Sequence, residues 1–227
     1  MTAPSRLWLA LAAMLAAPFI GYGIVYLGAG PDARQAEGQS LPPPEIIRQA
    51  VLTDPIEAGD FSLTDNRGRV FDAKAFEGKW SFVLFGYTHC PDVCPFTLTN
   101  MAYIREAMAA TLPEQELPQF VFISVDPARD RPENLDDYIS YFDPAFRAAT
   151  GSIDQVDKLV KQVGAYYRHE RKNADGEYEV THSAEIFVFD PKARLFATLQ
   201  PPLDPKDITH RFRALTAHFQ AAGGANS

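Results

Sequence analysis

The chain has 227 residues and a formal net charge of −8, from 21 basic and 29 acidic side chains. Because the lysines and arginines are scattered rather than clustered, the chain lacks the basic surface that nucleic-acid binding needs, and we expect no nucleic acid among its partners. It contains only two cysteines, which are too few for a disulfide-stapled scaffold. Metal binding or redox chemistry is therefore their expected use.

Residues 1–28 predict one transmembrane anchor. Residues 7–27 form a run of 21 residues without a charged side chain, which at about 1.5 Å per residue crosses the roughly 30 Å of hydrocarbon in a bilayer. A cleaved signal peptide is the alternative, but the run is long for one, and no convincing cleavage site follows near residues 28–30. Since the leader lacks the composition of a mitochondrial transit peptide, we expect a bacterial inner membrane, crossed once, with the soluble domain in the periplasm.

Residues 29–53 predict a flexible linker. The segment carries Pro31 and three consecutive prolines at 42–44, a composition that favours extended, polyproline-like conformations. Such a linker would hold a domain away from the bilayer, although the same segment could instead pack on the domain. The soluble domain is expected over residues 54–222, which is long enough to bury a core of its own.

The first half of this domain predicts a hairpin and two buried strands. Residues 61–64 alternate apolar and polar side chains, residues 65–68 have turn composition, and an extended pattern resumes at 70–71, as in a hairpin. Residues 80–85 and 120–125 are short apolar and aromatic runs, typical of strands buried on both faces.

The second half predicts helices that alternate with strands. Ser152 and Gln155 fit a capping box, and Asp204 followed by Pro205 fits a helix N-cap with proline in the first turn. Alternating elements that end with a pair of strands predict an α/β fold, a mixed sheet flanked by helices on both faces. The elements expected here are helices at 132–142, 152–163 and 205–220 and strands at 165–169, 178–180, 185–189 and 195–199.

The two cysteines lie where a strand is followed by a helix. Cys90 and Cys94 come after the strand at 80–85, and residues 96–110 repeat apolar side chains at helical spacings. Free N–H groups and the helix dipole stabilise thiolates there, so we expect both sulfurs to be reactive. Positions four apart face the same way on a helix, so the pair can bind a thiophilic ion or close into a disulfide. A reactive cysteine pair at such a turn predicts a thioredoxin-like architecture.

The five histidines are candidates for a third metal ligand. His210 and His218 lie on the final helix, where solvated histidines are common, and His169 has cationic neighbours that disfavour a metal ion. His89 is adjacent to Cys90 on an extended segment, so its side chain should point away from that cysteine. His182 begins a core strand between small polar residues, as an edge-of-sheet ligand should. Because a lone histidine is often only hydrogen-bonded, the residues alone leave this assignment open.

Three stretches of the domain carry a resemblance to a known family. Residues 85–95 contain a Cys-x-x-x-Cys-Pro motif after an aromatic residue and a glycine, residues 125–130 read Val-Asp-Pro-Ala-Arg-Asp, and His182 precedes a strand that ends at Asp190. In this order the stretches resemble the Sco/SenC family of copper-binding cytochrome oxidase assembly proteins. Thr181 is a departure, since the family often has an aspartate before the histidine, which puts tuning by a neighbouring carboxylate in doubt.

The resemblance implies a membrane-tethered, thioredoxin-like domain that binds copper, as Cu(I) or Cu(II), through Cys90, Cys94 and His182. It implies that the redox-active cysteines help to metallate or reduce the dinuclear copper site of cytochrome c oxidase. The implied partners are the copper-bearing subunit of the oxidase, other copper chaperones and thioredoxin-like reductants. No catalytic residue and no enzymatic activity beyond a thiol-disulfide reductase activity are expected.

Other interpretations remain open from the residues themselves. A metal-independent thiol-disulfide oxidoreductase is one, although such enzymes commonly use a Cys-x-x-Cys spacing. A copper or redox sensor of the cell envelope is another, and zinc is a chemical alternative to copper because two cysteines, one histidine and water resemble some zinc sites. We interpret Asp126 and Arg129 first as a strand-end turn with a local ion pair and second as elements that position a loop over the site.

Overall fold

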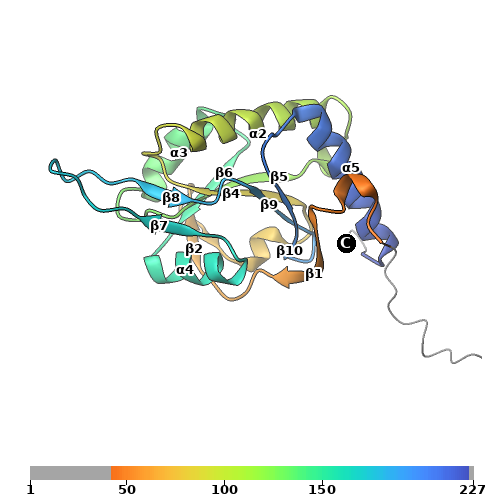
Figure 1. Ribbon diagram of the computed structural model, residues 1–227, viewed down its shortest axis with the longest axis horizontal. Helices are drawn as coiled ribbons and strands as arrows, with labels where there is room; N and C mark the ends of the chain where they lie inside the picture. Colours follow the sequence, from red (N-terminus) through yellow and green to blue (C-terminus); the bar gives the residue numbers. More distant parts are fainter. Residues whose placement is uncertain (1–41, 225–227) are drawn as a thin grey trace, which may run out of the picture. The chain divides into compact units, whose positions relative to one another are not determined.

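The computed structural model describes residues 42–224, which carry a mixed eight-stranded sheet with helices on both faces (Figure 1). The strand order is β1-β10-β9-β4-β5-β6-β2-β3, and β7 and β8 form a separate two-stranded sheet. The helices are η2 (Glu45–Ile47), η3 (Ala73–Phe76), α2 (Val93–Ala109), η4 (Glu114–Glu116), α3 (Pro132–Ser140), α4 (Ile153–Gln162) and α5 (Pro205–Ala221). The strands are β1 (Val51–Glu57), β2 (Leu63–Asp65), β3 (Val70–Phe71), β4 (Ser81–Gly86), β5 (Gln119–Ser124), β6 (Arg147–Thr150), β7 (Tyr167–His169), β8 (Val180–His182), β9 (Ile186–Phe189) and β10 (Arg194–Leu199).

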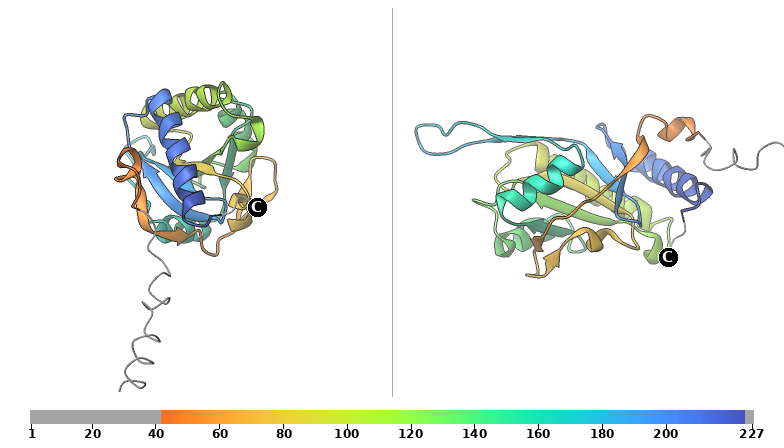
Figure 2. Two further views of the ribbon diagram at one scale, coloured as in Figure 1. Left: turned by 90° about the vertical axis from the view of Figure 1, so that its right-hand side faces the viewer. Right: turned by 90° about the horizontal axis from the view of Figure 1, so that it is seen from below.

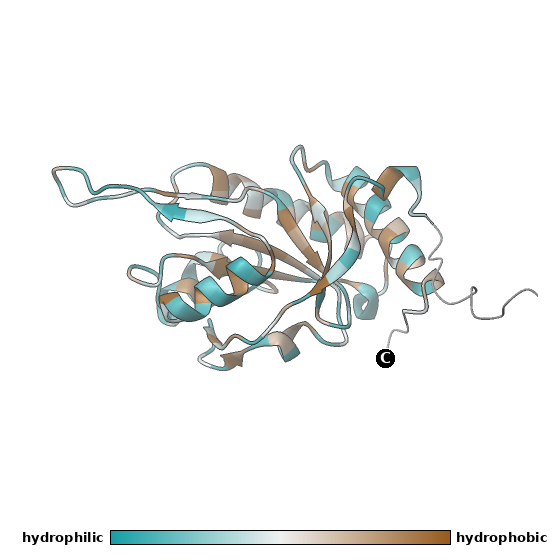
Figure 3. Cartoon of the chain, turned by 60° about the horizontal axis from the view of Figure 1, so that its bottom comes forward, coloured by the Kyte–Doolittle hydropathy of each residue, from teal (hydrophilic) through white to brown (hydrophobic). Residues whose placement is uncertain are grey.

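The centre of the main sheet is β4, which pairs in parallel with β5 and antiparallel with β9. All six residues of β4 are buried, because α2 and α5 cover one face of the sheet and α4 lies on the other (Figures 1 and 2). A strand covered on both faces needs apolar side chains at every position rather than at alternate ones. In Figure 3 the central strands are accordingly brown, whereas the outward side of α4 is teal. The end of β4 is therefore held rigidly in the core.

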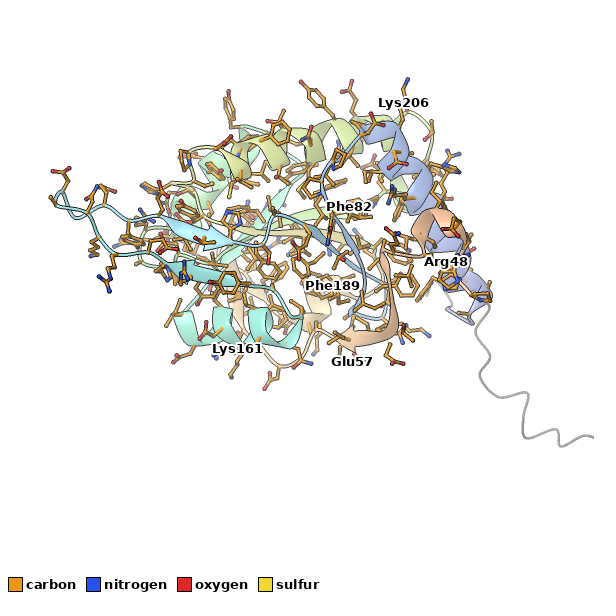
Figure 4. The ribbon with its side chains drawn as sticks, viewed as in Figure 1. Arg48, Glu57, Phe82, Lys161, Phe189 and Lys206 are labelled. Carbon is orange, nitrogen blue, oxygen red and sulfur yellow. The ribbon has the colours of Figure 1, made fainter. Side chains whose placement is uncertain are left out.

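Aromatic side chains fill the space between the layers. Phe82 contacts Phe120 on β5 and Phe212 on α5 with ring centroids 5.3 and 5.6 Å apart, and Phe189 stacks on Phe76 at 4.4 Å. Figure 4 shows Phe82 and Phe189 inside the domain, while Lys161 and Lys206 lie at its periphery. Burying one such side chain contributes about 1.5–3 kcal/mol, so this packing holds β4 against β5 and α5.

Most expected elements are confirmed. The buried runs at 80–85 and 120–125 are β4 and β5, and the hairpin at 61–71 is β2 and β3. Asp204 caps α5 through hydrogen bonds from the backbone N–H groups of Lys206 and Asp207. The helix predicted over 152–163 is α4, but its capping box is wrong, because the Gln155 side chain instead accepts a hydrogen bond from the N–H of Ser62.

Two strands and one boundary differ from the sequence-based expectation. The strands β1 and β6 were not expected, and β1 contains a proline, which is tolerated because β1 lies at the edge of the sheet. Of the linker expected over 29–53, residues 29–41 lie outside the described residues. From position 45 the chain forms η2 and then β1, and Ile47 is fully buried against the core. This part of the segment packs on the domain, which is the alternative that its composition left open.

The anchor predicted over residues 1–28 lies outside the described residues. Within residues 42–224, no helix has both the length and the apolar character needed to cross a bilayer.

The β7 and β8 strands lie against the domain, and the loop that joins them extends away from it at the left of Figure 1. The register of the two strands pairs Tyr167 with His182 and His169 with Val180, and the segment between the two strands forms the tip. This hairpin, residues 167–182, places His182 at its base, next to the start of β9.

Candidate metal centre

The two cysteines are positioned by the turn that joins β4 to α2. Cys90 donates a backbone hydrogen bond to the carbonyl oxygen of Tyr87 at 3.2 Å, which tightens the turn. Cys94 lies in the first turn of α2, and its backbone N–H points at the sulfur of Cys90, 3.4 Å away. An N–H group at the start of a helix thus faces Cys90, where it stabilises negative charge.

Gly86, the last residue of β4, makes room for the sulfur of Cys94. A Cβ atom at this position would lie 2.5 Å from that sulfur and 2.8 Å from the ring of Phe122, both closer than non-bonded atoms approach. Any larger residue would displace the sulfur or the strand, so the glycine is needed for close approach rather than for an unusual backbone angle.

His182 completes a group of three potential ligands. Its Nε2 atom lies 3.2 Å from the sulfur of Cys94, and its Nδ1 atom lies 2.9 Å from the carbonyl oxygen of Ser183. Because a carbonyl oxygen only accepts, the proton of the neutral ring belongs on Nδ1, which leaves the lone pair of Nε2 directed at the sulfurs. The ligand atoms of Cys90, Cys94 and His182 all lie within 4.8 Å of one another.

The two thiols differ in acidity because they share one negative charge. The hydrogen bond from Cys94 lowers the pKa of Cys90, and hydrogen bonds from His182 and from backbone N–H groups lower it further. Together these interactions outweigh burial, which alone would raise the pKa. The same interaction raises the pKa of Cys94, and its burial raises it further. The sequence led us to expect a stabilised thiolate at both positions, whereas only Cys90 has a lowered pKa. The thiolate of the metal-free protein belongs to Cys90.

The imidazole responds to the same charge. Burial alone would lower the pKa of His182, but its interaction with the thiolate of Cys90 and its hydrogen bond to Ser183 raise that pKa above its ordinary value. The negative charge on Cys90 therefore makes the ring easier to protonate than burial alone would allow.

Asp130 connects the cysteine turn, residues 87–92 between β4 and α2, to β5. Its carboxylate is 1% exposed and accepts hydrogen bonds from the backbone N–H and the hydroxyl of Thr88 and from the hydroxyl of Ser124. Three donors to one buried carboxylate fix the turn two residues before Cys90. Sequence reasoning assigned no role to Asp130, although its place six residues beyond the buried strand β5 was a signal.

The other histidines lie outside the cluster. His89 is half exposed, with its Nδ1 atom 3.0 Å from the hydroxyl of Thr88. His169 lies on β7, where its Nε2 atom is 3.6 Å from the carboxylate of Asp126. His210 and His218 lie on α5. Of the five candidates, the structure brings only His182 to the two sulfurs.

The strand-end ion pair between Asp126 and Arg129 is confirmed. The pair also contacts Tyr178, since the tyrosine hydroxyl donates to Asp126 at 2.7 Å and Arg129 donates to the Tyr178 carbonyl oxygen at 3.0 Å. Sequence reasoning missed Tyr178, because nothing in the local pattern shows which loop lies above the end of β5.

A cavity of about 250 Å³ opens beside Cys90 and His182. Its walls include Pro91 and Asp92 from the cysteine turn and Glu179 and Thr181 from the hairpin. An ion or a partner's side chain can therefore reach the sulfur of Cys90, whereas Cys94 is fully buried.

The comparisons with known proteins agree with this geometry. The family described as SCO1/SenC matches residues 50–217. The Protein SCO2 homolog, mitochondrial, of Bos taurus is 31% identical over 210 residues, which are 92% of this chain and 76% of that protein. A putative copper-binding protein of Stutzerimonas stutzeri is 34% identical over 62% of this chain and 68% of its own length. The chain spans only 53% of the human SCO2 homolog.

Solved structures share the fold. The structure of Arabidopsis thaliana ScoI with copper bound has a TM-score of 0.64 and 28% identity, over 70% of this chain and 98% of that one. Yeast Sco1 with copper bound has a TM-score of 0.64 and 31% identity, over 70% and 87% of the two chains. The predicted fold class, a thioredoxin-like mixed sheet flanked by helices, is confirmed for the described domain.

The difference in acidity predicts selective alkylation. In reduced, metal-free protein at about pH 6, iodoacetamide should modify Cys90 and leave Cys94 unmodified, because only a thiolate reacts and the lowered pKa of Cys90 keeps it ionised in acid. Peptide mass mapping after a short exposure measures both sites, and urea-denatured protein at about pH 8.5, where both thiols should react, is the control. Modification of Cys94 at an equal or greater rate would contradict the assignment of the thiolate.

Proposed function

Because the chain belongs to the SCO1/SenC family, we propose that it binds one copper ion through Cys90, Cys94 and His182 and helps to assemble the dinuclear copper site of cytochrome c oxidase. The observation that carries this proposal is the convergence of two sulfurs and one imidazole nitrogen within 4.8 Å, without a carboxylate in the group. Copper is the cargo of such a protein rather than a resident cofactor.

The donor set suits copper better than the common alternatives. Thiolate and imidazole are the soft and intermediate ligands that copper accepts in both oxidation states, whereas carboxylate and carbonyl oxygens would indicate magnesium or calcium. Structural zinc sites almost always have four protein ligands, and the described residues supply three; catalytic zinc sites can share this donor set, so the preference for copper over zinc rests on the family. Cu(I) accepts three donors, while Cu(II) would take a further weak donor from the adjacent cavity.

Each of the three ligands has a different role in binding. The thiolate of Cys90, beside the open cavity, is the first donor that an arriving ion meets. Binding then displaces the proton of Cys94, since only the deprotonated sulfur is a good ligand, and it requires the neutral form of His182. The hydrogen bond from Nδ1 of His182 to Ser183 holds the ring with Nε2 toward the ion.

The same dithiol supports a reductase role within the proposed function. Attack by the Cys90 thiolate on a partner's disulfide would form a mixed disulfide and release one partner thiolate. Attack by Cys94 would then release the second, so two electrons pass to the partner as the Cys90–Cys94 disulfide forms. The partners we propose are the copper-bearing subunit of the oxidase, other copper chaperones and thioredoxin-like reductants.

Location is a further part of the proposal. Both bacterial and mitochondrial relatives are found, and the apolar run at residues 7–27 supports a single anchor in a bacterial inner membrane. The described domain would then lie in the periplasm, where disulfides form and persist.

Metal content and disulfide turnover together separate the proposed function from its alternatives. The reduced protein should bind about one equivalent of copper, and the Cys90–Cys94 disulfide should abolish binding, because both reactions consume the same thiolates. Because the proposed reductase role concerns a specific partner's disulfide, reduction of a model disulfide such as that of insulin should be negligible. Rapid turnover without copper binding would instead establish a metal-independent oxidoreductase, and a stoichiometric copper complex of the disulfide form would contradict the ligand assignment.

Replacing the third ligand should affect the two oxidation states differently. In His182→Ala, two thiolates still bind Cu(I), but Cu(II) prefers more donors and is reduced by unsupported thiolates. Affinity for Cu(II) should fall by more than about 100-fold, the upper end of what loss of an outer-shell partner costs, and the thiolate-to-copper absorption band should disappear. Competition titrations and visible spectra measure both effects.

His218→Ala provides the control for this experiment. His218 lies on α5, outside the ligand cluster, so its replacement should leave both oxidation states unchanged. A wild-type cupric band in His182→Ala, or its loss in His218→Ala, would show that the ligand has been assigned to the wrong histidine.

A further inference from the structure

The strand that carries His182 is not part of the main sheet. The cysteines follow β4 at the centre of the eight-stranded sheet, whereas β8 pairs only with β7. No backbone ladder therefore fixes the distance between the imidazole and the sulfurs. Only residues 183–185 join His182 to β9, so that distance depends on this short connection and on side-chain contacts between the hairpin and the domain.

One group of buried polar contacts comes from the end of β5. Asp126 is fully buried, and its carboxylate binds Arg129 and accepts a hydrogen bond from the hydroxyl of Tyr178 at 2.7 Å. Its other neighbour is His169 on β7, at 3.6 Å. The carboxylate thus contacts both sides of the hairpin from the rigid core.

Arg129 extends the contact to the metal centre. Its guanidinium carbon lies 3.7 Å from the ring centroid of Tyr178 and 5.4 Å from that of Tyr87, distances at which a cation and an aromatic face attract. Tyr178 precedes His182 by four residues, and the ring of Tyr87 packs edge-on against that of His182 at 6.0 Å. Arg129 therefore contacts one tyrosine on the hairpin and another on the cysteine turn.

We infer that the Asp126–Arg129 ion pair positions His182 for metal binding by holding the hairpin against the end of β5. Neither residue is a ligand in this inference, which rests on the proposed role of His182. Without Arg129, the buried carboxylate of Asp126 would lose its charge partner, and the hairpin would lose both the hydrogen bond to the Tyr178 carbonyl and the stacked guanidinium. The imidazole would then sample positions away from the sulfurs.

Arg129→Gln tests the inference in the full-length protein. We expect its affinity for Cu(II) to fall about tenfold, the lower end of the range for outer-shell partners, with a weakened and shifted thiolate-to-copper band, while Cu(I) binding by the two thiolates changes less than threefold. Tyr178→Phe keeps the ring and removes only the hydroxyl that donates to Asp126, so it should shift the band in the same direction by a smaller amount. Arg129→Lys, which keeps the charge but not the planar fork, should restore part of the affinity.

A matched control comes from the opposite end of the strands. Asp190 is fully buried and binds Arg194 through two hydrogen bonds of 2.9 and 2.6 Å, at the turn between β9 and β10. Arg194→Gln therefore removes the same kind of ion pair without touching the hairpin. It should lower the midpoint of thermal unfolding while the affinity for copper and the cupric spectrum stay as in the wild type.

A double variant separates failure of this inference from failure of the proposed function. If Arg129 acts through His182, Arg129→Gln should have no further effect on copper affinity in the His182→Ala background. Equal losses of affinity in Arg129→Gln and Arg194→Gln, an unchanged cupric band in Arg129→Gln, or additive effects in the double variant would each overturn the positioning role. An unchanged band in His182→Ala would instead refute the ligand on which the inference rests.

Discussion

The site depends on the contact between the sulfur of Cys94 and the backbone of Gly86. Because β4 is covered on both faces, its last residue is fixed in the core, and the missing side chain of Gly86 lets α2 begin directly against the strand. That approach buries Cys94 completely and turns the N–H of its first helical turn toward Cys90. Packing therefore gives the two thiols different acidities. Cys90 is available as a thiolate, and Cys94 keeps its proton until a metal ion or a disulfide bond replaces it.

The three donors come from parts of the fold that differ in how they are held. The cysteine turn is fixed by β4, α2 and the hydrogen bonds to Asp130, whereas His182 lies on a hairpin with no ladder to the main sheet. Two donors on the core and one on a separately attached hairpin would suit the proposed delivery of copper, because a movement of the hairpin would change the coordination number without disturbing the core. The ion pair of Asp126 and Arg129 would set how readily that movement occurs.

Local patterns identified what depends on neighbouring residues in the chain, and they failed where distant segments meet. The continuous apolar runs of β4 and β5 and the spacing of Cys90 and Cys94 predicted the strand-to-helix turn and the fold class. The Arg147–Thr150 strand was missed because four residues with two alanines carry no periodic signal. The unequal acidity of the cysteines and the contact between Tyr178 and Asp126 follow from burial and from long-range packing, which no local pattern encodes.

The central claim is that two sulfurs and one imidazole, from the cysteine turn and the hairpin, bind a single copper ion. X-ray absorption spectroscopy of the protein loaded with one equivalent of Cu(I) tests this most directly, because sulfur and imidazole nitrogen scatter at different distances and imidazole adds outer-shell features. We predict a first shell of two sulfurs and one nitrogen, with the imidazole features lost in His182→Ala. A shell of sulfur alone in the wild-type protein, or one dominated by nitrogen and oxygen, would contradict the account.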